Sequence, residues 1–211
     1  MTIHDCVGIE FPIDEEIFKS NVGLRGLIKN IEDKVEIQSD LEEVAGSLRS
    51  LNAMLQRQET LMPTLGYKEY FYACESIVGH ATVMYAKAFN SNPRRKRLSS
   101  NKYFRDAPER VLSAHNFFIN LRNKYFSHAE ASLNAHKLHV LPGKFNSCPI
   151  VSPGSQVTRA VMATSYNWVH LIEAAEIIIG KLKAEIYELC KDLEQLLTDE
   201  QIAVINSKRR Y

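Results

Sequence analysis

Glycine, proline and cysteine are all scarce in this sequence. The 211 residues include nine Gly, seven Pro and four Cys. The four cysteines lie far apart and form no CxxC pair, which argues against a disulfide framework and against a four-cysteine zinc site. We therefore expect free thiols in a reducing compartment. The few Gly and Pro residues cluster, and the long segments between them are typical of helices.

The sequence also lacks a long apolar run and an excess of charge of one sign. No stretch reaches the roughly 18 apolar residues of a membrane span, and the first residues do not join a basic segment to an apolar one. We expect no membrane association and a cytoplasmic location. The formal net charge is +1, with 45% hydrophobic and 24% charged residues. The surface as a whole is therefore not basic, and any contact with nucleic acid must be made by a local cluster of cations.

Apolar periodicity predicts the first two long helices. Over 41–55 the apolar positions alternate spacings of three and four, which lines one face of a helix. We expect this helix to begin near Ile28 or Glu32 and to end before a break at 63–66. A second helix, rich in aromatic residues, is predicted over 68–90 and should be buried on most sides.

The last large segment, 158–197, is also predicted to be helical. It forms either one long helix or two, with Gly180 as the weak point. Thr198 and Gln201 have the spacing of a capping box, so we expect a short terminal helix after them.

One small β element interrupts this helical pattern. Alternating apolar and polar residues at 137–141 and 148–152 predict a hairpin. The sum is an all-α fold, an up-and-down bundle of four to five helices with one small β-hairpin, over a single domain at 1–211.

The connection at 91–109 carries a local excess of positive charge. Six cations stand against two acids there, an excess of six minus two, or four. We expect a flexible basic loop. The next helix should have Asp106 as its N-cap and Pro108 in its first turn, and it should continue to about 132. The six cations are Arg94, Arg95, Lys96, Arg97, Lys102 and Arg105.

This third helix contains polar residues that packing does not explain. It has two adjacent apolar stripes and should be nearly buried, so Arg122 and Asn123 need partners or a cleft. His128 lies six residues beyond Arg122, about 9 Å along the axis and about 120° around it. Two copies of the helix facing each other across a two-fold axis would bring both side chains into one cleft. The stripes are Val111, Ala114, Phe118, Leu121 and Tyr125, and Leu112, Ile119 and Phe126.

The order Arg122, polar Asn123 and, after four further residues, His128 lies in the aromatic stretch FFINLRNKYFSHA. It resembles the signature of the HEPN superfamily, whose members are small α-helical bundles, usually dimers. Many of them are metal-independent ribonucleases in toxin–antitoxin, abortive-infection and other phage-defence systems. The resemblance covers 68–132 and implies a HEPN-like core over approximately 28–197. It also implies a homodimer with the site at its interface, and an antitoxin or defence-system protein as a further partner.

The resemblance implies cleavage of RNA without a metal or other cofactor. The ribose 2′-hydroxyl would attack the phosphate, and His128 would take its proton, since an imidazole has a pKa near 6.5. Arg122 would stabilise the charge on the phosphate oxygens, and Asn123 would orient one of these groups by hydrogen bonding. Cations would hold the RNA backbone. We expect these to be Arg94, Arg95, Lys96, Arg97, Lys102 and Lys124.

Other interpretations stay open. Arg110 and His115 are five residues apart, within the four to six residues that the HEPN signature allows between its arginine and its histidine. Val111 replaces the polar second residue of the signature, so we treat this pair as a negative control for the motif. Arg122 and His128 would alternatively form a structural pair in a non-catalytic helical module that binds RNA or a protein. The stripe at 41–55 could be a coiled-coil surface instead of a core face.

The remaining histidines have simpler interpretations. His80 lies in an apolar helix and His170 lies beside Trp168, so we expect both to be core histidines with satisfied hydrogen bonds. A zinc site is conceivable but lacks a second close ligand pair. Its ligands would be His128, His136, His139 and Cys148.

Overall fold

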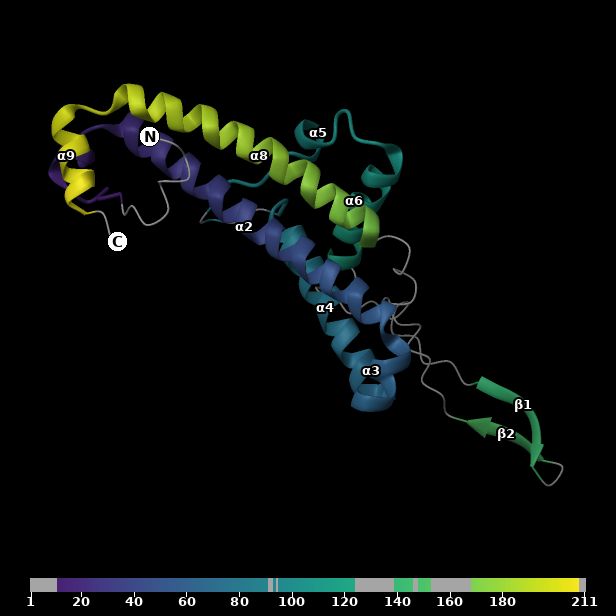
Figure 1. The fold of residues 1–211 in the computed structure, drawn as a ribbon. Helices are drawn as coiled ribbons and strands as arrows, with labels where there is room; N and C mark the ends of the chain where they lie inside the picture. The colour runs from purple at the N-terminus through teal and green to yellow at the C-terminus, as the bar shows by residue number, and fades with distance from the viewer. Residues whose placement is uncertain are drawn as a thin grey trace.

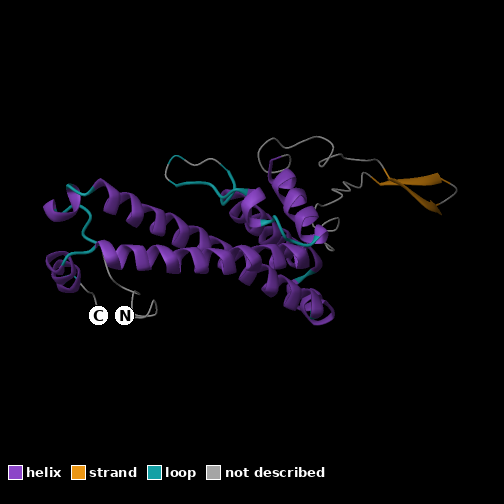
Figure 2. Ribbon diagram, turned by 90° about the horizontal axis from the view of Figure 1, so that it is seen from above, coloured by secondary structure: helices purple, strands orange, loops and turns teal. Residues whose placement is uncertain are grey.

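Two long antiparallel helices form the axis of the protein. The structure is a computed structural model that describes residues 11–90, 93, 95–123, 139–145, 148–152 and 168–208. Helices α2 (Val22–Gln56) and α8 (Trp168–Leu196) lie side by side in both ribbon views (Figures 1 and 2). Ion pairs fix their antiparallel register, since Lys34 contacts Glu185 near the middle of α2 and Arg49 contacts Glu176 toward the C-terminal end of α2. The 35 residues of α2 span about 50 Å.

Two further helices complete a four-helix bundle at one end of this pair. Helix α4 (Tyr67–Lys87) packs antiparallel to α2, and α6 (Glu109–Leu121) packs against α4 and α8. The short helices connect these elements or cap the other end, where α1 and α9 lie (Figure 1). They are α1 (Glu16–Lys19), α3 (Gln58–Leu65), α5 (Ser100–Tyr103) and α9 (Asp199–Ser207).

The core follows this architecture in two parts. The larger cluster joins α2, α4, α6 and α8, and Leu41, Val44, Leu48 and Leu51 of the predicted stripe are buried in it. The stripe at 41–55 is therefore a core face. A smaller cluster holds the end where α1 and α9 pack on α2 and α8. It consists of Phe18, Leu24, Ile28, Leu193 and Ile205.

The predicted all-α class is confirmed, and so are several of the predicted elements. Helix α8 continues through Gly180 without a break. Thr198 and Gln201 form the expected capping box, with the hydroxyl of Thr198 accepting from the backbone N–H of Gln201. Strands β1 (His139–Phe145) and β2 (Cys148–Ser152) pair antiparallel as the predicted hairpin.

Three predicted boundaries were wrong. Helix α2 begins at Val22, because the side chain of Asn21 accepts from the backbone N–H of Leu24 and caps it. The segment after α2 forms α3 with Pro63 inside it, and the chain turns only at Gly66, where φ is +92°. Asp106 does not cap α6, which begins at Glu109 directly after Pro108. Pro108 lacks a side-chain acceptor, so no side chain caps that end.

Candidate functional site

The predicted motif lies at the C-terminal end of α6. Val111, Ala114, Phe118 and Leu121 are buried as the stripe predicted, and the helix ends at Leu121. Arg122 and Asn123 follow in a wider turn of π type and are half-buried, unlike the stripe before them. Such turns recur at functional sites in helical proteins.

The first two motif residues interact with each other. Nη1 of Arg122 donates to Oδ1 of Asn123 over 3.2 Å. The amide of Asn123 therefore presents its oxygen to the guanidinium. His128 lies outside the described residues, so the structure brings together two of the three predicted catalytic residues.

Arg110 and His115, the pair that serves as a negative control, make contacts that join helices. His115 is buried, its Nδ1 is 2.9 Å from the hydroxyl of Tyr85, and its Nε2 is 2.9 Å from Oγ of Ser100. Burial lowers the pKa of His115 to about 4, so the ring is neutral at pH 7. Arg110 binds Glu173 of α8 with two hydrogen bonds, of 3.1 and 2.6 Å. Arg110 and His115 therefore link helices and share no site.

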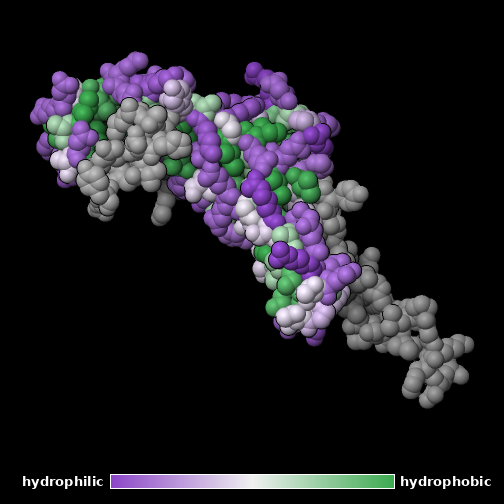
Figure 3. All heavy atoms as spheres, in the orientation of Figure 1, coloured by the Kyte–Doolittle hydropathy of each residue, from purple (hydrophilic) through white to green (hydrophobic). Residues whose placement is uncertain are grey.

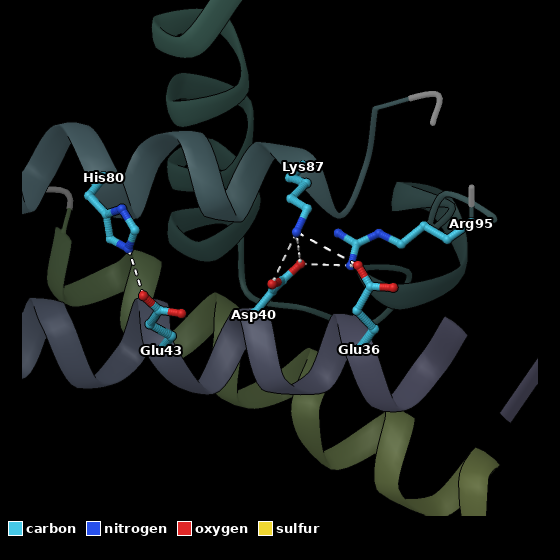
Figure 4. Close-up of polar contacts among 6 residues, drawn as sticks. All are labelled: Glu36, Asp40, Glu43, His80, Lys87 and Arg95. Carbon is cyan, nitrogen blue, oxygen red and sulfur yellow. Dashed lines mark hydrogen bonds and ion pairs between the residues drawn. The ribbon is translucent and has the colours of Figure 1, made fainter. Parts of the chain in front are cut away.

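An ionic cluster fixes the start of the basic connection on α2. Figure 4 shows Arg95 and Lys87 directed at Glu36 and Asp40. Nη1 of Arg95 lies 2.9 Å from Glu36 and 2.7 Å from Asp40, and Lys87 lies 3.1 Å from Asp40. The side chain of Arg95 is only 2% exposed, so its charge is turned inward. The expectation that Arg95 holds RNA therefore does not fit its position.

A second cluster holds the other end of the same connection. Glu185 of α8 accepts from Lys34 over 2.5 Å and from the hydroxyl of Tyr103 over 3.0 Å, and Lys102 lies 2.7 Å away. Burial alone would raise the pKa of Glu185, but the hydrogen bonds from Lys102 and Lys34 outweigh it and lower the pKa. In addition, Nζ of Lys181 donates to the backbone oxygen of Tyr103. Lys102 is therefore paired as well.

Sequence reasoning missed both clusters because it counted charges along the connection alone. A signal for the first cluster was present on α2, where Asp33, Glu36, Asp40 and Glu43 are spaced by three, four and three and so share one helical face. An acidic face of this kind on an otherwise core-forming helix indicates that cations pack against it. Nearby, the backbone N–H of Lys96 also donates to Asp33 over 3.2 Å.

The remaining cations of the connection that the structure describes are exposed to solvent. Lys96, Arg97 and Arg105 are exposed, and none of them has an acidic or aromatic partner among the described residues. Arg94 and Lys124, which we also expected to bind RNA, lie outside the described part of the chain.

The two histidines expected in the core are not fully buried. The side chain of His80 is 48% exposed and contacts Glu43 over 2.8 Å (Figure 4), so that prediction was wrong. His170 is 31% exposed, and its Nδ1 lies 3.5 Å from Glu173. His170 therefore lies at the edge of the α6–α8 contact.

Metal binding finds little support in the described residues. They contain no group of three or more His, Cys, Asp and Glu side chains placed to hold a metal ion. Of the four ligands considered for zinc, His128 and His136 lie outside the description. The strand register pairs His139 with Ser152 and Cys148 with Phe145, which places the two at opposite ends of the hairpin, four residues or about 13 Å apart along β2.

Neither the described helices nor the comparisons with known proteins identify a function. Among the described residues, no helix combines the length and hydropathy that a membrane span requires. The chain matches no protein-family model, no curated protein and no solved structure. Its function must therefore be inferred from its own residues.

Proposed function

We propose that this protein is a metal-independent endoribonuclease of the HEPN type, acting in phage defence or in toxin-type growth arrest. The observation that carries the proposal is the pair Arg122–Asn123, two polar, half-buried residues that follow the buried stripe of α6 and hydrogen-bond to each other. The helix itself is amphipathic and not nearly buried as expected, since five of its residues are exposed. These are Glu109, Arg110, Ser113, Asn116 and Asn120. The all-α bundle around the pair agrees with the fold that the motif implies.

The chemistry follows from the side chains. The ribose 2′-oxygen forms a bond to phosphorus and the bond from phosphorus to the 5′-oxygen breaks, which leaves a 2′,3′-cyclic phosphate and a 5′-hydroxyl. His128 takes the proton of the 2′-hydroxyl, and the departing 5′-oxygen takes up a proton from water. The forked donors of Arg122 stabilise the charge that gathers on the non-bridging oxygens. Asn123 acts through Arg122, because its oxygen accepts from the guanidinium and fixes its orientation.

A dimer would complete the site. Arg122 and His128 are six residues apart and differ by about 120° around a regular helix, so two copies of the motif facing each other would gather both residues into one cleft. An antitoxin or other defence protein would act on this dimer.

Cleavage of RNA by the full chain in the presence of EDTA tests the proposal. Arg122→Ala and His128→Ala should each lower the rate by about 100-fold or more. Arg110→Ala and His80→Ala are matched controls, since they remove an exposed arginine and an exposed histidine outside the motif. Both should retain activity. Cleavage that persists in the two motif variants would refute the site.

The role of Asn123 needs a separate measurement. If Asn123 only positions Arg122, then Asn123→Ala should slow wild-type cleavage but should not slow the Arg122→Ala variant further. Equal losses in both backgrounds would show that Asn123 acts independently. Binding of RNA without any turnover would instead favour a non-catalytic module of the same fold.

A further inference from the structure

The cations of the connection between α4 and α6 fall into two groups with different environments. Arg95 and Lys102 are paired with acids of α2 and α8, and they fix the connection at both ends. Lys96, Arg97 and Arg105 are exposed and unpaired among the described residues. The neighbours of a paired cation are thus free to face solvent on a backbone that is held in place.

Unpaired cations are uncommon elsewhere in the described chain. Most lysines and arginines there contact a carboxylate, as Lys29, Lys183 and Lys191 do. Besides the three on the connection, the described cations whose side chains have neither an ion pair nor a hydrogen bond are Arg25, Arg57 and Lys68, which are exposed and scattered over α2, its C-cap and α4. Lys181 and Arg122 hydrogen-bond to a backbone oxygen and to Asn123, respectively. Among the side chains that the structure describes, half of the lysines and arginines with neither an ion pair nor a hydrogen bond are therefore gathered within ten residues, at 96–105.

We infer that Lys96, Arg97 and Arg105 form a binding surface for the phosphate backbone of single-stranded RNA. This inference rests on the proposed function and identifies where its substrate is held. Phosphates attract unpaired cations because binding releases counterions, and a backbone that is already held in place loses little conformational freedom on binding.

The chemistry of the connection favours a polyanion over other partners. Its large apolar side chains, Leu98, Tyr103 and Phe104, are buried, and hydrophilic side chains project from α5 and the adjoining loop (Figure 3). A membrane-binding segment would need exposed apolar anchors. A protein partner would usually need an apolar patch to bury.

The surface lies at a distance from the proposed catalytic residues. Helix α6 separates Glu109, just after the connection, from Arg122 by 13 residues, or about 20 Å. A dinucleotide is too short to reach across this distance. The surface should therefore contribute to binding of long RNA and not to binding or cleavage of a dinucleotide.

Fluorescence anisotropy with a 20-nucleotide, fully 2′-O-methylated RNA tests the inference, because this RNA binds but cannot undergo transesterification. The variant Lys96→Ala/Arg97→Ala/Arg105→Ala removes the surface. If each cation makes one phosphate contact, the slope of log K against log salt should fall by about 2, which corresponds to an affinity about 100-fold weaker at 0.1 M salt. The matched control Arg25→Ala/Arg57→Ala/Lys68→Ala removes the same charge from scattered positions and should change the affinity less than threefold.

Three outcomes would overturn the inference: equal losses in the two triple variants, no binding of this RNA, or binding of phosphatidylserine vesicles in its place. The result is separable from that of the cleavage test. Binding of RNA that depends on Lys96, Arg97 and Arg105 but is not followed by cleavage would support the binding surface and refute the proposed enzymatic function. If the triple variant Lys96→Ala/Arg97→Ala/Arg105→Ala cleaved long RNA at the wild-type rate, the enzymatic function would stand and the binding surface would be refuted.

Discussion

Replacing Arg95 with Met should destabilise the fold although Arg95 belongs to a connection and not to a helix. The substitution keeps most of the apolar stem but removes a guanidinium that is 2% exposed. Glu36 loses a hydrogen bond of 2.9 Å, and Asp40, whose side chain is 11% exposed, loses a counter-charge at 2.7 Å.

The magnitude follows from what remains in the cluster. Removing one partner of a buried ion pair costs about 3–5 kcal/mol because the other charge stays buried and uncompensated. Lys87 remains 3.1 Å from Asp40 and provides part of the missing compensation. We therefore expect the lower end, a loss of about 3 kcal/mol in the free energy of unfolding.

Urea denaturation measures this loss, and the next residue supplies the control. With a slope of about 2–3 kcal/mol per M for a chain of this size, the midpoint should fall by about 1–1.5 M urea. Lys96→Met changes an exposed, unpaired side chain and should stay within about 0.5 kcal/mol of wild type. A loss below about 1 kcal/mol for Arg95→Met, or equal losses in both variants, would contradict an inward-facing Arg95 that stabilises the fold.

Three other perturbations test the described contacts. Gly66→Ala should lower the free energy of unfolding by about 1–3 kcal/mol, because φ is +92° there and a Cβ would meet Glu69 at 2.5 Å. Gly46→Ala, which has open space around it inside α2, should instead raise the free energy of unfolding by about 0.5–1 kcal/mol. Thermal unfolding measures both changes. The pKa of His115 is lowered from 6.5 to about 4 by burial. Between these values the unfolded chain binds a proton that the folded chain does not. The free energy of unfolding should therefore decrease as the pH falls from 6.5 toward 4, by up to about 3 kcal/mol. Urea titrations at each pH measure this decrease, and His115→Phe should remove it. Thr198→Ala should cost about 1 kcal/mol by breaking the capping box of α9, and a cost below about 0.3 kcal/mol would show that this helix does not depend on its cap.

The elements that could be predicted from the sequence were those with a local signal. Apolar periodicity identified the burial of 41–55 and of the α6 stripe, and the capping box at Thr198 needed only residues close in sequence. The start of α2 was missed because an asparagine is common in loops and Asn21 becomes a cap only when the helix after it forms.

The environment of the basic connection could not be predicted from its own composition. Whether Arg95 or Lys96 faces solvent depends on which of them meets Glu36 and Asp40, residues that are more than 50 positions away in the sequence. The environment of His115 likewise depends on other elements, since its two partners come from α4 and α5, 30 and 15 positions away. Tertiary contacts of this range decide which cation is structural and which is available to a ligand.

The ends of the RNA products distinguish transesterification from other modes of cleavage. A mixed-sequence pool of RNA should be incubated with the wild-type chain in EDTA, beside the same pool carrying 2′-O-methyl groups throughout. The proposed function predicts cleavage of the unmodified pool alone, with 2′,3′-cyclic phosphate and 5′-hydroxyl ends by mass spectrometry. Cleavage of the methylated pool, products with 5′-phosphate ends, or activity that EDTA abolishes would contradict the account.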